Sequence, residues 1–260
     1  MEGTAFEIIS RNQTPLHTIL YADGCKQATA RRPVLIILCH GFKGDKSEKG
    51  RFTATVQQLN QNGFHALVFD FSGSGENRRE PILLSRQVTD LEDVARWATA
   101  NGYGDIGTIG LSFGGITALM ADLPHRKAAV FWSPALYPQK SASLLEHLLA
   151  KVMRRFPSVT VKRPSSGNFP PIVVNAAFTE EVFNLDTDRY LKRFATPSLI
   201  LQGRKDTVVR PENTRRAFSQ MPQDADHQYI EVEGAAHDFD GDDLTPFIRH
   251  TAAWFSRYLV

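Results

Sequence analysis

Short apolar segments alternate with longer amphipathic segments along most of the chain. The short segments are rich in β-branched and aromatic residues, which is typical of buried strands. They cover residues 6–10, 16–23, 33–40, 65–71, 106–112, 127–133, 197–203 and 227–234. The first two segments flank the turn sequence RNQTP and therefore predict an antiparallel pair of strands.

Amphipathic helical patterns fill most of the intervals between these strands. They cover residues 51–63, 88–102, 113–123, 211–221 and 244–259. Strands that alternate with helices predict an α/β fold, with a mostly parallel central sheet of about eight strands flanked by helices. In such a sheet, the functional site lies beyond the carboxyl ends of the strands.

One interval is too long for a simple crossover connection. Residues 134–189 begin with a helical pattern that places Leu145 and Leu149 on one apolar stripe, and they continue through a loop rich in Pro, Ser and Gly. Long insertions at the strand ends of a sheet commonly form lids. We therefore expect a lid at residues 134–189 on a core made of residues 1–133 and 190–260. A surface subdomain without a role in binding is the alternative.

The sequence GLSFGG at residues 110–115 places a serine between a predicted strand and a predicted helix. Gly110 and Gly114 lie two positions to either side of Ser112. Small residues there permit the sharp turn of a nucleophile elbow, which exposes the serine hydroxyl. Because glycine-rich turns are common, the alternative is an unreactive serine in a turn. The positions of a base, a carboxylate and oxyanion-binding amides decide between the two interpretations.

Two residues that follow the last predicted strands have the chemistry that a nucleophilic serine needs. Asp206 comes just after strand 197–203, and His237 comes just after strand 227–234. A neutral histidine can take the serine proton, and a carboxylate fixes the tautomer of the imidazole and stabilises the imidazolium. The sequence therefore predicts a catalytic triad of Ser112, Asp206 and His237.

A loop that could bind an oxyanion follows the predicted strand 33–40, where the sequence reads HGFKG. We expect the backbone N–H groups of Phe42 and Phe113 to stabilise the negative oxygen that develops during acyl transfer. His40 is expected to brace this loop, and Asp70 to hydrogen-bond to loop backbone, rather than to transfer protons. The alternative is that HGFKG forms only a turn.

Together, the motifs HGFKG, GLSFGG, GRKDTVV and GAAHDF resemble those of the α/β-hydrolase family over essentially the whole chain. The short insertion and the stretch from HGFKG to FSGSGE make the chain most similar to small bacterial cinnamoyl- and feruloyl-esterase-like and serine-aminopeptidase-like members. Its elbow reads LSF, where that branch commonly reads HSQ. The resemblance implies the α/β-hydrolase fold and a two-step acyl-enzyme mechanism that uses neither a cofactor nor a metal.

We therefore expect a serine hydrolase that cleaves carboxylic esters of small to medium acyl or aromatic acids. The expected lining of its substrate pocket is Lys43, Leu145, Leu149 and Phe169. Peptidase, amidase or thioesterase activity with the same triad is the first alternative. A non-catalytic binding protein that keeps the fold is the alternative from another class.

Composition adds little to this interpretation. Hydrophobic residues make up 42% of the chain, charged residues 22%, and the formal net charge is +2, as in ordinary soluble globular proteins. No basic run predicts nucleic-acid binding, and the longest apolar run, VLIILC, is too short to span a membrane. The N-terminus lacks a signal-peptide pattern. We expect a cytoplasmic monomer or homodimer that acts on a small-molecule ester.

Overall fold

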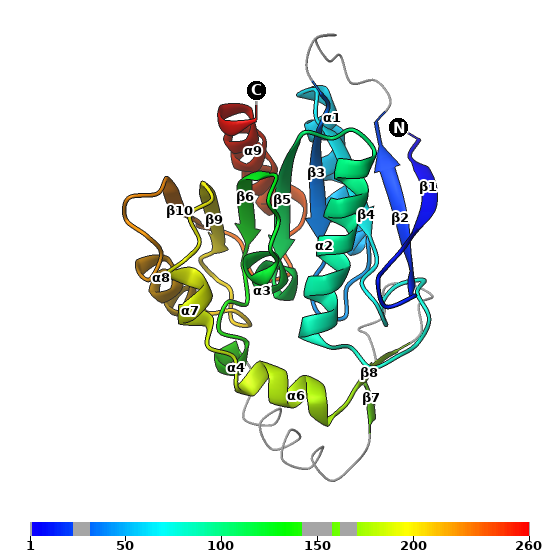
Figure 1. Ribbon diagram of the computed structural model, residues 1–260. Helices are drawn as coiled ribbons and strands as arrows, with labels where there is room; N and C mark the ends of the chain where they lie inside the picture. The colour runs from blue at the N-terminus through cyan, green and yellow to red at the C-terminus, as the bar shows by residue number, and fades with distance from the viewer. Residues whose placement is uncertain (1, 23–31, 142–157, 162–170, 260) are drawn as a thin grey trace.

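The computed structural model describes residues 2–22, 32–141, 158–161 and 171–259 (Figure 1). An eight-stranded sheet runs through its centre in the order β1-β2-β4-β3-β5-β6-β9-β10. Its strands are β1 (Thr4–Ile9), β2 (Pro15–Tyr21), β3 (Val34–Cys39), β4 (His65–Phe69), β5 (Asp105–Leu111), β6 (Arg126–Trp132), β9 (Ser198–Gly203) and β10 (His227–Val232). Strand β2 pairs antiparallel with β1 and with β4, and the other neighbouring strands pair in parallel. The mostly parallel sheet predicted from the sequence is confirmed.

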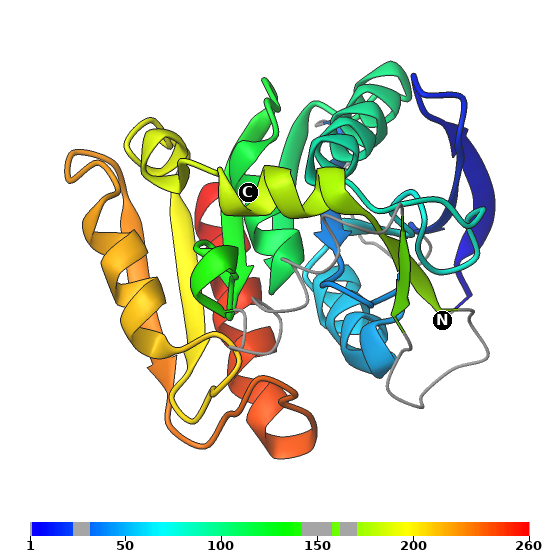
Figure 2. The same ribbon diagram turned by 90° about the horizontal axis from the view of Figure 1, so that it is seen from below.

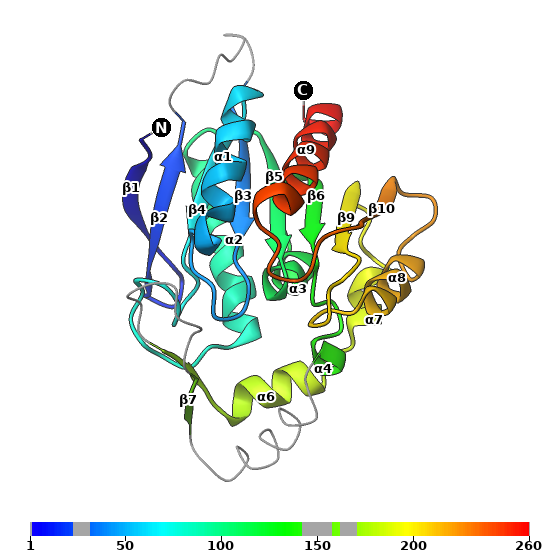
Figure 3. The same ribbon diagram turned by 180° about the vertical axis from the view of Figure 1, so that it is seen from behind.

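Helices cover both faces of this sheet (Figures 1 and 3). They include the 3-10 turn η1 (Glu48–Gly50) and the helices α1 (Arg51–Gln61), α2 (Leu84–Ala100), α3 (Phe113–Met120), α8 (Pro211–Ser219) and α9 (Gly241–Tyr258). In β3, Leu35 and Ile37 pack in the core cluster that holds residues of α2, α3 and α8. Ile36 and Leu38 pack in a second cluster, with residues of α1 and α9. Because both faces of β3 are covered, its sequence is an unbroken apolar run.

The five predicted helices are all present with bounds that differ by up to four residues from their sequence patterns, and α2 and α3 show the physical reasons. Helix α2 begins at Leu84 rather than at residue 88, because Leu84 and Leu91 are both buried in the same core cluster and lie on one face of the helix. Helix α3 ends at Met120 rather than at residue 123. The next residue, Ala121, has an extended backbone, and the guanidinium of Arg126 donates a hydrogen bond to the carbonyl oxygen of Ala118.

The stretch between β6 and β9 adds short elements at the edge where the parallel strands end (Figure 2). These are α4 (Pro138–Ser141), β7 (Val159–Val161), β8 (Ile172–Val174), α6 (Ala176–Phe183) and α7 (Thr187–Leu191). Strands β7 and β8 form a separate antiparallel pair, and α6 crosses the strand-end edge of the large sheet (Figure 1). The backbone N–H of Ile82 donates to the carbonyl of Val173 at 3.0 Å, which attaches β8 to the loop before α2.

The sequence patterns predict neither β7 and β8 nor α6 and α7, because runs of three to eight residues are too short to establish a period. The predicted helix that carries Leu145 and Leu149 lies outside the described residues, and so does Phe169. Within the described part of the chain, no helix has the length and apolar character needed to cross a membrane.

Candidate active site

Ser112 occupies a sharp turn between the end of β5 and the start of α3. Its backbone has φ 51° and ψ −115°, a conformation that is strained for any residue with a Cβ atom. Three backbone hydrogen bonds hold it there. The N–H of Ser112 donates to the carbonyl oxygen of Trp132 at 2.9 Å. The carbonyl oxygen of Ser112 accepts from the backbone N–H groups of Gly115 at 3.0 Å and of Ala135 at 2.9 Å. The strand, turn and helix predicted around this serine are therefore present.

The two glycines of the motif are required by the close approach of α3 to the sheet. A Cβ atom built on Gly114 would lie 2.2 Å from the carbonyl oxygen of Cys39. A Cβ atom built on Gly110 would lie 2.6 Å from the carbonyl oxygen of Gly114. Real Cβ atoms do not approach other atoms so closely. A larger residue at either position would push the helix away from β3 and change the direction in which the serine points.

Asp206 and His237 lie at the same edge of the sheet and join Ser112 in a chain of hydrogen bonds. The distance between Nδ1 of His237 and Oδ2 of Asp206 is 2.8 Å. The distance between Nε2 of His237 and Oγ of Ser112 is 3.1 Å. The side chain of Asp206 is fully buried, whereas that of His237 is 18% exposed. The structure thus brings together the three residues that the sequence selects as a triad.

The second oxygen of Asp206 fixes the orientation of the carboxylate. Oδ1 accepts hydrogen bonds from the backbone N–H groups of Val208 at 2.9 Å and of Val209 at 2.8 Å. Oδ2 accepts a longer hydrogen bond of 3.3 Å from Nε2 of Gln202 and is oriented to accept the Nδ1 proton of His237. The neutral imidazole then carries its lone pair on Nε2, the nitrogen that faces Ser112, so this side can receive a proton.

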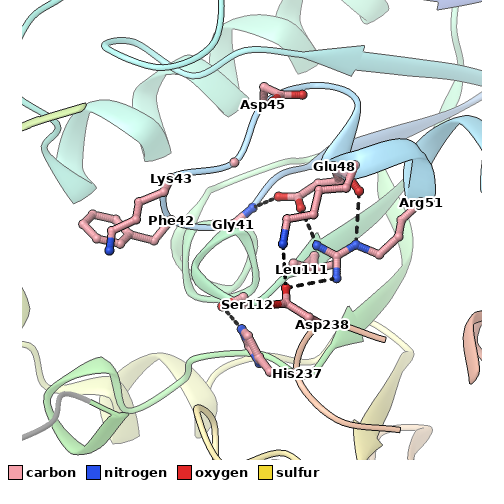
Figure 4. A pocket seen from close by; sticks show the side chains of 12 residues that line it. Gly41, Phe42, Lys43, Asp45, Glu48, Arg51, Leu111, Ser112, His237 and Asp238 are labelled. Atoms are coloured by element: carbon pink, nitrogen blue, oxygen red, sulfur yellow. Dashed lines mark hydrogen bonds and ion pairs between the residues drawn. The ribbon is translucent and has the colours of Figure 1, made fainter. Parts of the chain in front are cut away.

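The loop after β3 brings the predicted oxyanion residues to the serine. A Cβ atom built on Gly41 would lie 3.2 Å from Cβ of Ser112, so the loop backbone passes directly over the elbow. Phe42, Ser112 and His237 line one pocket (Figure 4). Phe113 is the first residue of α3, where a backbone N–H has no partner within the helix. Its ring centroid lies 5.8 Å from that of Phe42.

His40 braces this loop, as the sequence suggests. The backbone N–H of Phe71 donates to Nε2 of His40 at 3.1 Å, so a neutral ring carries its proton on Nδ1. Nδ1 then donates to the carbonyl of Gly41 at 2.9 Å. Asp70 likewise holds loop backbone, because its carboxylate accepts from the N–H of Lys46 at 2.7 Å and from that of Glu76 at 3.0 Å.

The pocket beside Ser112 is more highly charged than the sequence motifs suggest. Lys43 lines it, as predicted, and its Nζ lies 5.6 Å from the ring centroid of Phe42. Sequence reasoning missed Glu48 and Arg51, although an acidic and a basic residue at i and i+3 are a recognised signal for a pair. Asp238, the residue after His237, is largely exposed, and its Oδ1 lies 3.1 Å from Nζ of Lys49.

The pKa of Asp238 results from two opposing effects. Partial burial acts to raise the pKa of its carboxyl group. The hydrogen bond from Lys49, with the charges of Lys49 and Arg51, acts in the opposite direction and leaves the pKa lowered. The carboxylate next to His237 is therefore kept ionised.

Among the residues that the structure describes, no group of three or more His, Cys, Asp or Glu side chains is arranged to hold a metal ion.

Known proteins resemble this chain in sequence and in fold. Residues 31–182 match the family described as serine aminopeptidase, S33. Lipase 1 of Psychrobacter immobilis is 25% identical over an alignment that covers 87% of this chain and 80% of the lipase. The structure of Est1E from Butyrivibrio proteoclasticus with bound ferulic acid has a TM-score of 0.75 at 20% identity, and the match covers 98% of this chain and 99% of Est1E. A monoacylglycerol lipase of Paleococcus ferrophilus has a TM-score of 0.76 at 20% identity, and the match covers 93% of this chain and 98% of the lipase.

Proposed function

Because this chain belongs to the serine aminopeptidase S33 family of α/β-hydrolases, we propose that it hydrolyses carboxylic esters with Ser112 as the nucleophile. The observation that carries the proposal is the pair of hydrogen bonds, 3.1 Å and 2.8 Å long, that connect Ser112 to His237 and His237 to Asp206. The lipases of Psychrobacter immobilis and Paleococcus ferrophilus support ester rather than peptide substrates.

Acylation begins when Oγ of Ser112 attacks the ester carbonyl carbon and its proton passes to Nε2 of His237. The carbonyl oxygen becomes an oxyanion, which accepts hydrogen bonds from the N–H groups of Phe42 and Phe113. The carboxylate of Asp206 stabilises the imidazolium without taking its proton. When the tetrahedral intermediate collapses, the bond to the alcohol breaks, and His237 donates its proton to the leaving oxygen.

Deacylation repeats these steps with water as the nucleophile. His237 takes a proton from water as the water oxygen attacks the acyl-enzyme carbonyl. The second tetrahedral intermediate then releases Ser112, which recovers a proton from His237, and the carboxylic acid leaves. Every proton transfer passes through Nε2 of His237, and no cofactor takes part in any step.

The insertion at residues 134–189 is proposed to act as a lid that shapes the acyl site. Support comes from Phe178 of α6, whose ring stacks on Phe42 with centroids 5.5 Å apart and planes inclined by 13°. The same ring lies 5.7 Å from that of Phe113. An apolar wall therefore joins the lid to both residues that are proposed to bind the oxyanion. Such a wall fits aromatic or medium-length acyl groups.

Covalent labelling tests the proposal directly. A fluorophosphonate probe should label the wild-type protein on Ser112, as peptide mapping would show, and should not label Ser112→Ala. Turnover should then be compared for a chain-length series of nitrophenyl esters, hydroxycinnamate esters, an aminoacyl nitroanilide and an acyl thioester. Absence of label on the folded wild-type protein would overturn the proposal and favour a binding role. Faster turnover of the nitroanilide or the thioester would replace the ester assignment.

A further inference from the structure

A buried ion pair lies directly behind the proposed oxyanion loop. The side chains of Glu48 and Arg51 are 5% and 6% exposed, and Nη2 of Arg51 lies 2.9 Å from Oε2 of Glu48. The other oxygen of Glu48 accepts a hydrogen bond of 2.6 Å from the backbone N–H of Gly41 (Figure 4). One carboxylate thus connects a buried guanidinium to the backbone beside the nucleophile.

The turn η1, which carries Glu48, has a left-handed backbone at three consecutive residues. Glu48 has φ 46° and Lys49 has φ 58°, and they are followed by Gly50 at φ 89°. Only glycine adopts this left-handed conformation without strain, so two consecutive strained residues persist only where other contacts hold them. Both oxygens of the Glu48 carboxylate make such contacts.

The carboxylate fills the concave side of the loop that it holds. A Cβ atom built on Gly44 would lie 2.2 Å from Oε1 of Glu48, so the loop wraps closely around this oxygen. The carbonyl of Gly41 accepts hydrogen bonds from the N–H of Gly44 at 2.9 Å and from His40 at 2.9 Å. Glu48 therefore fixes the N–H side of Gly41, while Gly44 and His40 fix its carbonyl side.

These contacts determine where the next amide points. In a trans peptide, the C=O of one residue and the N–H of the following residue point in opposite directions. Because the Gly41 carbonyl is held towards Gly44 and His40, the N–H of Phe42 must point away from them. Without Glu48, the N–H of Gly41 loses its acceptor and the peptide that precedes Gly41 can rotate, so only the two contacts of the Gly41 carbonyl remain to hold the Phe42 amide in place.

The same ion pair also contacts the loop of the catalytic histidine. Nη1 of Arg51 lies 3.9 Å from Oδ1 of Asp238, the residue that follows His237. Nζ of Lys49 lies 3.1 Å from the same oxygen. The segment that holds the oxyanion loop is thereby connected to the segment that holds the base.

We propose that Glu48, held by Arg51, is a positioning residue that acts through Gly41 to direct the N–H of Phe42 at the developing oxyanion. This inference rests on the proposed function of Ser112 as a nucleophile. Glu48 transfers no proton in this role. A buried ion pair contributes little net stability on average, so positioning gives a physical reason for its presence here.

The chain offers a closely matched control for a Glu48 substitution. The side chain of Asp93 in α2 is also 5% exposed. Its Oδ2 accepts from the backbone N–H of Arg11 at 2.6 Å, and its Oδ1 lies 2.9 Å from Nε of the same arginine. Asp93 therefore makes the same kinds of contact as Glu48, but it is not among the residues that line the pocket beside Ser112.

The test compares Glu48→Ala, Glu48→Gln and Asp93→Ala with the wild type, using a nitrophenyl ester and thermal unfolding. Glu48→Ala should lower kcat by about 100-fold and leave KM within about threefold, because a misdirected oxyanion donor costs roughly that much. Glu48→Gln keeps one acceptor oxygen for Gly41 but loses the charge that pairs with Arg51, so it should lower kcat by only about three- to tenfold. Asp93→Ala should lower Tm by a similar amount and change kcat by less than about threefold.

An inhibitor that mimics the tetrahedral intermediate provides the second measurement. A trifluoromethyl ketone forms an oxyanion on the enzyme, so Glu48→Ala should weaken its inhibition by about the factor lost in kcat/KM. The proposal is overturned if kcat of Glu48→Ala stays within threefold of wild type, or if Asp93→Ala loses as much kcat. If Glu48→Ala does not fold, unchanged kcat and unchanged ketone inhibition in Glu48→Gln overturn it. Failure of the wild type to label on Ser112 would instead overturn the proposed function.

Discussion

Replacing Asp206 by asparagine is expected to reverse the tautomer of His237. Oδ1 of Asp206 accepts two backbone N–H groups, from Val208 and Val209. In Asp206→Asn, the amide oxygen must take that position, because an NH₂ group cannot accept these protons. The NH₂ group then occupies the position of Oδ2, which lies 2.8 Å from Nδ1 of His237. Nδ1 becomes the acceptor, and the imidazole proton moves to Nε2.

This change removes the general base while it leaves the geometry of the site intact. With a proton on Nε2, His237 faces Ser112 with a donor and cannot accept the hydroxyl proton. A wrong tautomer of this kind lowers kcat by about 10⁴-fold, which corresponds to about 5 kcal/mol of barrier. KM should change little, because Asp206 is buried behind the histidine and does not line the pocket. Stability should fall only modestly, because the hydrogen bonds to Val208 and Val209 remain, while the hydrogen bond that Nε2 of Gln202 donates to Oδ2 is lost.

Hydrolysis of a nitrophenyl ester under saturating substrate measures the effect, and the rate of fluorophosphonate labelling at Ser112 gives an independent measure. Asp93→Asn is the control, because it also neutralises a buried carboxylate that accepts a backbone N–H. A kcat for Asp206→Asn within tenfold of wild type would show that the carboxylate does not set the tautomer. The assignment of Asp206 would then have to be abandoned.

Three further changes have expected outcomes. Ser112→Gly should be more stable to thermal unfolding than Ser112→Ala by about 1 kcal/mol, because glycine adopts this backbone conformation without strain; equal Tm values would contradict the strain. Burial raises the pKa of the Asp90 carboxyl from 3.8 to about 7. The folded state therefore binds this proton more tightly, so the contribution of Asp90 to stability should fall by up to about 4 kcal/mol as the pH rises from about 4 to 7. In denaturant unfolding, the stability of the wild type relative to Asp90→Asn should fall over this range, and a difference that does not change with pH would refute the assignment. Phe178→Ala should lower kcat/KM for aromatic and long-chain esters by about tenfold, since it removes ring contacts with both Phe42 and Phe113, and should leave acetate ester turnover within about threefold. A uniform loss across all acyl lengths would argue against a wall of the acyl site.

The sheet and the triad could be predicted because their signals are local and combine through a simple rule of topology. Each strand is recognisable by its own β-branched and aromatic residues, and the carboxyl ends of parallel strands meet at one edge. Ser112 ends a predicted strand, and Asp206 and His237 each come three residues after the end of one. Their positions along the chain therefore sufficed to place them together.

Glu48 and Arg51 could not be found in this way because their role depends on a strained reversal of the chain. No sequence pattern indicates that Glu48 has a left-handed backbone, or that its carboxylate turns back to the amide of Gly41. The aromatic side of the proposed acyl site shows the same limit. Phe169, which the sequence suggests for the insertion, lies outside the described residues, and no sequence pattern selects Phe178, whose ring stacks on that of Phe42. Which of several aromatic residues reaches the site depends on packing between elements that are distant in sequence.

Under the proposed mechanism, the order of the strands along the chain also determines when the chain becomes reactive during its synthesis. Ser112 and the loop of Gly41 belong to the first half of the chain, and Asp206 and His237 follow β9 and β10, which are added one after the other at the far edge of the sheet. Chains are synthesised from the N-terminus, so the serine leaves the ribosome long before its base. A growing chain thus carries an unactivated hydroxyl until β10 has paired with β9. Under the proposed mechanism, reactivity towards esters is acquired only once the last strand of the sheet is in place.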